Sequence, residues 1–114
     1  MKKKFRVTKN YQFTSIINYK CFSTNACFSI YSKKNDLTYD RIGISVSKKL
    51  GNAVKRNKIK RQVRSMVDQY FDFNKGIDWI IIVRLAYLNY TYHENNNNLI
   101  NCLEKFKKRN KYEK

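Results

Sequence analysis

Proline is absent from this chain of 114 residues, and glycine and cysteine occur only three times each. The lack of proline accompanies an abundance of Asn, Lys, Ile and Tyr, which indicates a compositional bias of the whole genome. The cysteines, Cys21, Cys27 and Cys102, are odd in number and show no CxxC spacing. They predict reduced thiols that fill space, rather than a disulfide framework or a zinc site.

Long apolar runs are also missing. No stretch approaches the ~20 apolar residues that cross a bilayer, and no lipidation signal is visible. The first five residues carry the charges of a signal peptide, but no apolar segment follows them. We therefore expect a cytoplasmic protein without a membrane partner.

Few residues are suited to catalysis by the polypeptide itself. The single histidine, His93, lies inside a capping box formed by Thr91 and Glu94, where a structural role is favoured over a catalytic one. Asp68 and Asp72 share a helix face, where they offset nearby Lys and Arg rather than bind magnesium. No Gly-rich phosphate loop, nucleophile elbow or Cys–His pair occurs. The sequence thus predicts no catalytic residue and no metal ligand.

Positive charge is what the chain has in excess. It contains 25 Lys and Arg against eight Asp and Glu, a formal net charge of +17. The segment from Lys48 to Arg64 contains basic residues throughout and no acid. A charge run on a helix is usually a solvated face, but such a face normally includes acids. Their absence indicates that this segment binds nucleic-acid phosphates.

The basic segment opens a predicted helix that extends to about Phe71. Its apolar residues recur at helical spacing and form one stripe, composed of Ile59, Val63, Met66, Val67 and Tyr70. Its basic and amide side chains lie on the opposite side or flank it: Asn57, Lys58, Lys60, Arg61 and Arg64. Asn52 is the expected N-cap. The free amide groups of the first turn would form a phosphate site together with Lys55 and Arg56.

The other segments predict a single α+β domain over residues 1–114. A first helix is expected from the N-cap Thr8 to about Tyr19, and a last helix after the capping box. Strands are expected over 26–32, 41–47 and 78–84, the last of them central because it is apolar on both faces. We predict a sandwich of a small mixed sheet and helices, in the order α-β-β-β-α-β-α, which includes one strand before the basic helix that the patterns do not locate.

The strand over 41–47 has one face made of small residues. Ile42, Ile44 and Val46 alternate with Gly43, Ser45 and Ser47. Small residues let another backbone approach closely, and their hydroxyl groups can bind phosphate or sugar. The same residues would equally make room for the first helix. A cleft between that helix and the sheet would satisfy both interpretations.

The run RIGISVSKKLGNAVKRNKIKRQVR resembles the signature of the bacterial ribonuclease P protein subunit, and the similarity extends from Lys3 through the last helix. The matching signature residues are Lys49, Gly51, Asn52, Ala53, Val54, Arg56, Asn57, Lys60, Arg61 and Arg64. Phe13, Phe28 and Tyr31 also match. Two positions depart from the family: Lys58 replaces an arginine, and Ile17 replaces an aromatic residue one turn after Phe13.

The resemblance implies a division of labour. A catalytic RNA would carry the Mg²⁺ ions and the chemistry, and one protein would bind that RNA and the 5′ leader of precursor tRNA to support leader removal. The implied RNA-binding residues are Lys48, Lys49, Asn52, Lys55, Arg56, Asn57, Lys58, Lys60, Arg61 and Arg64. The implied leader cleft is lined by Phe13, Ile17, Phe28, Tyr31, Ser45, Ser47 and Lys49. The family fold also implies a left-handed βαβ crossover, and we expect flexible basic ends at residues 1–6 and 108–114.

Two other functions remain compatible with the composition. A general RNA-binding protein of ribosomal or chaperone type would have the same charge, but would bind tRNA with and without a leader alike. A metal-dependent nuclease that acts alone would cleave without added RNA.

Overall fold

The computed structural model describes residues 1–110, with side chains for residues 1–109. The helices are α1 (Asn10–Asn18), α2 (Ala53–Tyr70) and α3 (Tyr92–Asn110). The strands are β1 (Phe22–Thr24), β2 (Phe28–Lys34), β3 (Arg41–Val46) and β4 (Ile77–Val83). Short 3₁₀ turns cover Lys3–Phe5, Lys48–Leu50 and Leu85–Asn89. The order α-β-β-β-α-β-α is as predicted.

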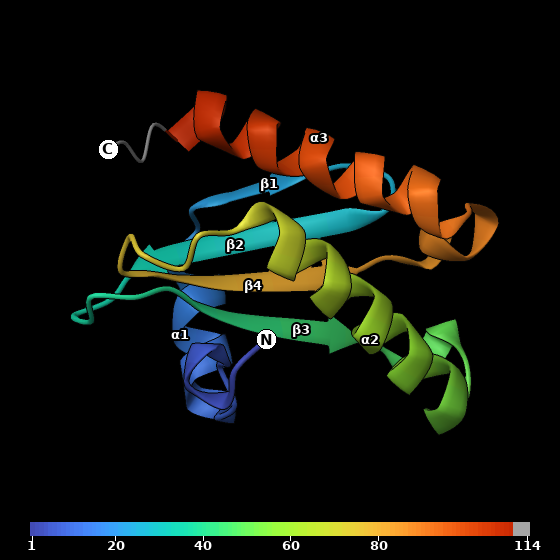
Figure 1. Cartoon of the computed structure of the whole chain (residues 1–114), viewed down its shortest axis with the longest axis horizontal. Coiled ribbons are helices and arrows are strands. Elements are labelled where there is room, and N and C mark those ends of the chain that lie inside the picture. Colours follow the sequence, from blue (N-terminus) through green and yellow to red (C-terminus); the bar gives the residue numbers. More distant parts are fainter. Residues whose placement is uncertain (111–114) are drawn as a thin grey trace.

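The four strands form one mixed sheet in the order β1-β2-β4-β3 (Figure 1). β2 pairs antiparallel with β1 and β4, whereas β3 pairs parallel with β4. β4 is central, and all its residues except Ile82 are buried. This confirms the strand predicted to be apolar on both faces, since α-helices lie on each side of it.

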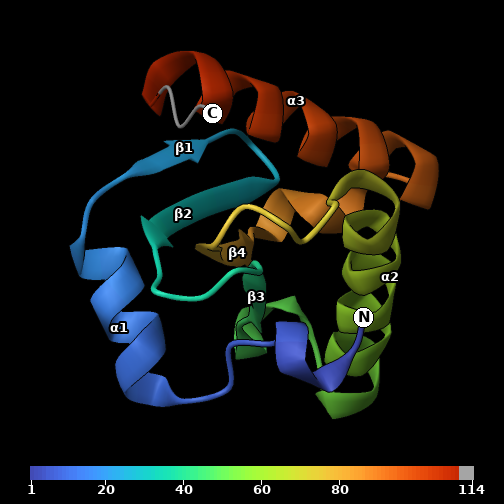
Figure 2. The ribbon, with the colours of Figure 1, turned by 60° about the vertical axis from the view of Figure 1, so that its left-hand side comes forward.

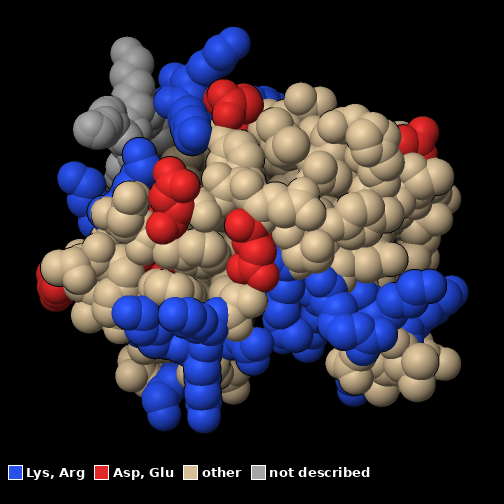
Figure 3. Space-filling model, viewed as in Figure 1, with Lys and Arg blue, Asp and Glu red and all other residues tan. Residues whose placement is uncertain are grey.

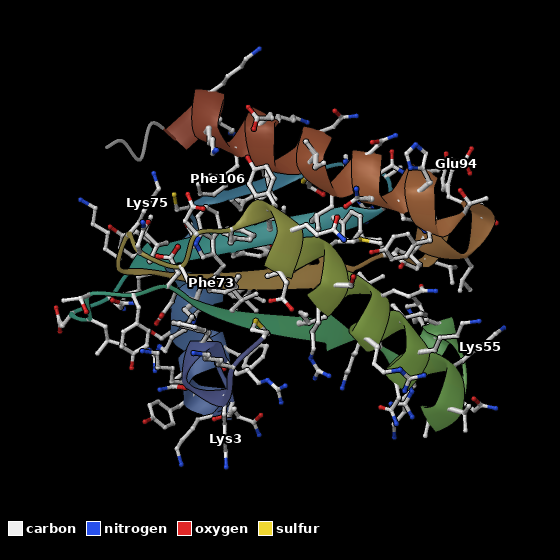
Figure 4. The ribbon with its side chains drawn as sticks, viewed as in Figure 1. Lys3, Lys55, Phe73, Lys75, Glu94 and Phe106 are labelled. Carbon is white, nitrogen blue, oxygen red and sulfur yellow. The ribbon has the colours of Figure 1, made fainter. Side chains whose placement is uncertain are left out.

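The helices cover the two faces of the sheet unequally. Figure 2 shows α1 on one side of the sheet and α2 and α3 on the other. The main core lies under α2 and α3, where Phe106 points from α3 to the sheet and packs against Trp79 (Figure 4). A smaller core under α1 contains Val7, Ile16 and Ile80. One helix covers only part of its face, which leaves the rest of that face accessible.

β3, α2 and β4 form a parallel βαβ unit with a left-handed crossover. Both strands point to the right in Figure 1, with β3 below β4, and the connecting helix passes on the viewer's side of the sheet. A chain that advances to the right while it passes from bottom to front to top turns as a left-handed screw. Such connections are right-handed in about 98% of cases. Periodicity alone would not predict this crossover, and the resemblance implied it.

The element boundaries differ from the expectations by one or two residues at several ends, and most informatively in α1 and β2. α1 begins after Lys9 rather than Thr8, and the Gln12 side chain accepts a hydrogen bond from the Lys9 N–H at 3.4 Å. β2 begins at Phe28 rather than Ala26, because the Asn25 carboxamide oxygen accepts hydrogen bonds from the N–H groups of Cys27 and Phe28. β2 also continues to Lys34, beyond the expected end of this strand at residue 32.

The two basic ends are structured where they are described. Lys3–Phe5 forms a 3₁₀ turn, Arg6 bridges to Ile42 of β3, and the Phe5 ring stacks on Phe73 with centroids 4.7 Å apart. At the other end, α3 continues through residues 108–110. Residues 111–114 of the expected basic tail lie outside the described residues. The aromatic and strand-edge contacts of residues 5–7 are long-range, which is why the local sequence indicated only a charged arm.

Candidate nucleic-acid interface

The start of α2 is fixed by the turn that precedes it. The Asn52 side chain accepts a hydrogen bond from the Lys55 N–H at 3.0 Å, which confirms the predicted N-cap. Gly51 adopts φ 138°, and a Cβ atom at this position would lie 2.6 Å from Cδ of Lys55. A glycine is therefore required there. Leu50 is buried beneath the turn and anchors it to the core.

The apolar stripe of α2 sets the direction of its basic face. Ile59, Val63, Met66 and Val67 are buried against the sheet and α3, and Tyr70 is partly buried, as predicted. Because the stripe is held inward, the opposite face is held toward solvent. Figure 3 shows basic side chains gathered along α2, and Figure 4 shows Lys55 projecting from its first turn, away from the sheet.

The basic face of α2 has no acidic partners within the described chain. The salt bridges among residues 1–110 are Met1–Asp68, Arg41–Asp78 and Lys107–Glu104. None of the cations predicted to bind RNA takes part in them. Unpaired cations on a rigid helix repel one another, and a polyanion relieves that repulsion.

The predicted RNA-binding residues do not all have the same surroundings. The exposed members are Lys48, Lys49, Asn52, Lys55, Asn57, Lys58 and Arg61. Arg56, Lys60 and Arg64 are half-buried. The Arg56 Nε–H donates to the Gly51 carbonyl at 3.2 Å, so Arg56 also braces the turn before α2. Asn52 has a similar structural role as the helix cap.

A pocket of about 270 Å³ joins α2 to the edge of β3 and the start of α1. Three of its lining residues are cations, Arg6, Lys60 and Arg64, and Phe13 forms part of its apolar wall. The buried Nε atoms of Arg6 and Arg64 have no hydrogen-bond partner. Burial, and to a lesser degree the charge of Arg6, lowers the pKa of Arg64 below its ordinary value. An anion in this pocket would accept hydrogen bonds from the two unpaired Nε–H groups and would offset the repulsion between the two guanidinium charges.

Sequence reasoning missed Arg6 as a member of this site. The Val7 N–H donates to the Ile42 carbonyl at 3.1 Å, and this pairing to β3 brings Arg6 beside Arg64. The partner of residue 7 is 35 positions away along the chain, so no local pattern marks the contact.

The small-residue face of β3 lies under α1 at one end and extends beyond it at the other. A Cβ atom at Gly43 would lie 2.6 Å from Cζ of Phe13, so at Gly43 the small residue makes room for α1. Ser45 is only half-buried and Ser47 is exposed. The two interpretations therefore apply to different residues: Gly43 makes room for α1, whereas Ser45 and Ser47, the latter just after β3, are accessible.

Three features therefore adjoin one another: the basic face of α2, whose cations form no salt bridges among the described residues, the cationic pocket, and the part of the sheet face that α1 does not cover. The family model for Ribonuclease P matches residues 1–107. The chain belongs to the ribonuclease P family.

Relatives in this family match over nearly their whole length. The ribonuclease P protein component of Mycoplasma mycoides subsp. mycoides is 45% identical, over 94% of this chain and 100% of the relative. A Staphylococcus aureus RNase P protein mutant, described as having defective mRNA degradation activity, is 38% identical with a TM-score of 0.85, over 92% of this chain and 90% of that chain. The RNase P protein of Thermotoga maritima is 28% identical with a TM-score of 0.77, over 88% of this chain and 96% of that chain.

Within the ribonuclease P fold, the structure brings part of the predicted leader cleft together. Phe13, Ile17 and Tyr31 are half-buried and pack around Ile16 and Ile80 on the α1 side of the sheet. Lys49 is exposed in the 3₁₀ turn after β3. Ile17, where the family has an aromatic residue, completes this smaller core as an aliphatic contact.

The assignment of Phe28 to the cleft is wrong. Phe28 is 0% exposed, and its ring packs edge to face on Tyr87 with centroids 5.8 Å apart, under α2 and α3. Side chains alternate along a strand, so Phe28 and Tyr31, three residues apart, point to opposite faces of the sheet. The odd spacing was the signal that could have removed Phe28 from the cleft.

The candidates for catalysis remain separate in the ribonuclease P fold. The Thr91 and Glu94 side chains exchange hydrogen bonds with each other's N–H groups at 3.2 and 2.9 Å, which confirms the capping box, and His93 is exposed beside it. In the part of the chain that the structure describes, no three His, Cys, Asp or Glu residues are close enough to hold a metal ion. No described helix is both long and apolar enough to cross a bilayer.

Proposed function

We propose that this protein binds the catalytic RNA of ribonuclease P through α2 and the 5′ leader of precursor tRNA through the adjoining α1 side of the sheet. One protein would serve one RNA in the cytoplasm. The observation that carries the proposal is the run of α2 cations without ion pairs, continuous with a pocket that reaches Phe13. The two surfaces share an edge, so RNA and leader can be held at once.

The exposed cations of α2 supply the contacts to the catalytic RNA. Lys55, Lys58 and Arg61 lie on a helix whose direction is fixed by its buried stripe. Each phosphate contact of this kind releases a condensed counterion, so assembly weakens as the salt concentration rises. Lys58, where the family has arginine, keeps the charge but lacks the planar fork that binds phosphate in a bidentate manner.

The pocket between α2 and β3 takes a phosphate at the junction of the two surfaces. Arg6, Lys60 and Arg64 surround it, and Phe13 lies at its wall, where an unstacked base can pack. Beyond Phe13 the strand offers the hydroxyl groups of Ser45 and Ser47. These groups bind sugar or phosphate without selecting a base.

Catalysis is assigned to the RNA and its Mg²⁺ ions. The protein's cations lower the repulsion between leader and catalytic RNA phosphates, which raises substrate affinity and lets the Mg²⁺ sites fill at lower concentration. The polypeptide positions the leader and takes no part in proton transfer or metal binding.

The test is cleavage of a 5′-extended precursor tRNA at low Mg²⁺, with protein alone, cognate ribonuclease P RNA alone, and both. Cleavage at the mature 5′ end that is much faster with both components supports the proposal. A protein that fails to accelerate the RNA contradicts it. Equal affinity of the assembled enzyme for tRNA with and without a leader would instead favour a general RNA binder.

The protein-alone reaction has a second purpose. The S. aureus relative is described in terms of an mRNA degradation activity. The polypeptide alone is therefore also incubated with an mRNA that contains no tRNA. If it degrades this mRNA, and a chelator abolishes the degradation, the protein is a metal-dependent nuclease that acts without the catalytic RNA.

A further inference from the structure

An exposed apolar patch follows the end of β4. Of the eight large hydrophobic side chains that are exposed among the described residues, four lie between residues 85 and 92, so they are concentrated in one short segment. Leu85, Leu88 and Tyr90 are 57%, 43% and 45% exposed. Leu85 and Leu88 are three residues apart in a 3₁₀ turn, a spacing that places both side chains on one side of the turn. We call Leu85, Leu88 and Tyr90 the 85–90 patch.

Hydrogen bonds fix which side of α2 faces this segment. The Tyr87 ring is buried in the main core, and its hydroxyl donates to Oε1 of Gln62 at 2.8 Å. One turn farther along α2, the Tyr92 hydroxyl donates to the Ser65 hydroxyl at 3.0 Å. The side of α2 that carries Gln62 and Ser65 therefore lies against residues 87–92, which flank the 85–90 patch.

Two lysines lie nearer the N-terminus on the same side of α2. Lys58 precedes Gln62 by four residues and Lys55 precedes it by seven, which are spacings of one helix face. Both lysines are exposed, and neither forms a salt bridge among the described residues. The turn Lys48–Leu50, which adds two more exposed lysines, lies beside the turn Leu85–Asn89. The patch is therefore bordered by cations.

The surface views agree with this arrangement. Figure 3 shows an uncharged area between the start of α3 and the cations of α2, at the right-hand end of the molecule. Figure 4 shows Lys55 and Glu94 at this same end. Glu94 accepts a hydrogen bond from the Thr91 N–H as part of its capping box, and it forms no salt bridge with the α2 lysines in the described chain. The positive charge beside the patch is thus left without a counter-ion.

The charge around the patch selects its occupant. An apolar patch alone would also suit a second copy of this chain, but two copies would bring like charges together on a protein of net charge +17. A polyanion is favoured instead. Paired bases in an RNA helix offer no free ring face, whereas an unpaired nucleotide presents a base beside its phosphates. Aromatic and apolar side chains bordered by cations match that combination.

We propose that the 85–90 patch packs against an unpaired nucleotide of the catalytic RNA, with its base on Tyr90 and the two leucines and its flanking phosphates on Lys55 and Lys58. This inference rests on the proposed function, and it adds a base contact to the phosphate contacts of α2. The RNA would then be held by shape as well as by charge.

The two sides of α2 would have different tasks. Lys60 and Arg64 line the pocket that adjoins Phe13 and the proposed leader cleft. Lys55 and Lys58 lie on the other side of the buried stripe, next to the 85–90 patch. Loss of the patch should therefore weaken assembly with the catalytic RNA and leave the preference for precursor over mature tRNA unchanged.

The experiment measures the affinity of the whole protein for cognate ribonuclease P RNA over a range of salt concentrations. The test variants are Leu88→Gln and Tyr90→Gln, and Tyr90→Phe keeps the ring. The matched controls are Leu37→Gln and Tyr11→Gln, which change exposed apolar residues outside the patch. Thermal unfolding of each variant checks its fold, and sedimentation measures its oligomeric state.

The expected result is a loss of affinity that salt does not change. Tyr90→Gln weakens RNA binding roughly 5- to 150-fold, the range for one stacked base, and Tyr90→Phe binds like the wild type. The slope of log affinity against log salt stays the same, because no phosphate contact is removed. Lys58→Gln instead lowers the magnitude of that slope by roughly 0.7 to 0.9. Wild-type affinity in Tyr90→Gln and Leu88→Gln, or equal losses in the two controls, would overturn the inference.

Chemical probing of the RNA bases gives a second readout. One unpaired base should be protected by the wild type and by Tyr90→Phe, and should become reactive again with Tyr90→Gln. If the wild type and Tyr90→Gln protect the same bases, the patch does not contact a base, and the inference is wrong.

The outcomes also separate this inference from the proposed function. A wild-type protein that does not bind the cognate RNA contradicts the proposed function itself. A wild-type protein that binds the RNA, with patch variants that bind it equally well, contradicts only the base contact. Patch variants that change the oligomeric state and keep full RNA affinity would assign the patch to a second copy of the chain, which also overturns the inference.

Discussion

The ring of Phe13 occupies the space that a side chain at Gly43 would need. A Cβ atom on residue 43 would lie 2.6 Å from Cζ and 3.0 Å from Cε1 of the Phe13 ring, and 2.9 Å from Cδ1 of Ile80. The missing side chain thus fixes how closely α1 approaches the sheet. The width of the proposed leader cleft depends on this contact, because Phe13 forms one wall of the adjoining pocket.

Gly43→Ala should therefore move α1. We expect a loss of about 1–3 kcal/mol in the free energy of unfolding, the usual cost of overpacking, and a smaller preference for precursor over mature tRNA. Denaturant unfolding and tRNA binding measure the two effects. Ser45→Ala is the control for stability alone, since Ser45 lies on the same face and is half-buried but is itself proposed to contact the leader. An unchanged stability for Gly43→Ala would mean that α1 yields without cost.

Arg64→Gln should affect stability and function in opposite directions. The pKa of Arg64 is lowered by burial and by Arg6, so the folded protein carries an unfavourable charge here. We expect the free energy of unfolding to rise, because an unfavourable charge is removed, while affinity for precursor tRNA falls. Chemical denaturation and binding at one salt concentration test this. A drop in stability as large as the drop in affinity would indicate a structural role for Arg64.

Sulfate should stabilise the free protein through the same pocket. A ligand that binds only the folded state raises stability as its concentration passes its dissociation constant. We expect the midpoint of thermal unfolding to rise with sulfate, and to rise less in Arg64→Gln and Arg6→Gln than in the wild type. Lys108→Gln serves as the comparison for general screening. If it loses as much of the effect, the stabilisation comes from net charge and not from the pocket.

Ionisation of Asp40 should lower the free energy of unfolding as the pH rises. Burial raises its pKa above the ordinary value of 3.8, although the N–H groups of Ile77 and Lys75 donate to its Oδ1 atom at 2.8 and 3.2 Å. The folded state therefore binds this proton more tightly than the unfolded state, so the contribution is complete below pH 3.8 and is lost as the pH rises through the folded pKa.

Asp40→Asn keeps the accepting oxygen and removes the ionisation. We expect the variant to be more stable than the wild type at neutral pH, with the difference shrinking as the pH falls toward 3.8. The difference between the two unfolding free energies, measured across this range, cancels the other titrating groups. A difference that does not change with pH would show that the carboxylate is not penalised.

Arg61→Gln and Phe13→Leu should separate the two proposed surfaces. Arg61 is exposed on the basic face of α2, so its loss should weaken assembly with ribonuclease P RNA and leave the ratio of precursor to mature tRNA affinity unchanged. Phe13→Leu should lower that ratio roughly 5- to 150-fold, the value of one stacked base, at unchanged affinity for the RNA. Identical effects of both variants on both measurements would rule out separate surfaces.

Local sequence patterns predicted most helices and strands, whereas contacts between distant segments determine which residues meet in the candidate site. The stripe of α2, its cap at Asn52 and the capping box at Thr91 are local, and the structure confirms each. Strand alternation was equally local, yet counting from Phe28 to Tyr31 was needed to place them on opposite faces. β1 has three residues, too few for a periodic signal. The place of Arg6 depends on a contact between distant segments, which no single stretch reveals.

The strand order has a consequence for how the chain folds. β2 and β3 follow one another in sequence but are not neighbours, because β4 lies between them. β4 is also the last strand to emerge during synthesis, after the whole of α2. The four-stranded sheet therefore cannot be complete before β4 has emerged, because β3 joins it only through β4. Non-local closures of this kind slow folding, and a polyanion already bound to α2 would draw the repelling segments together while β4 inserts.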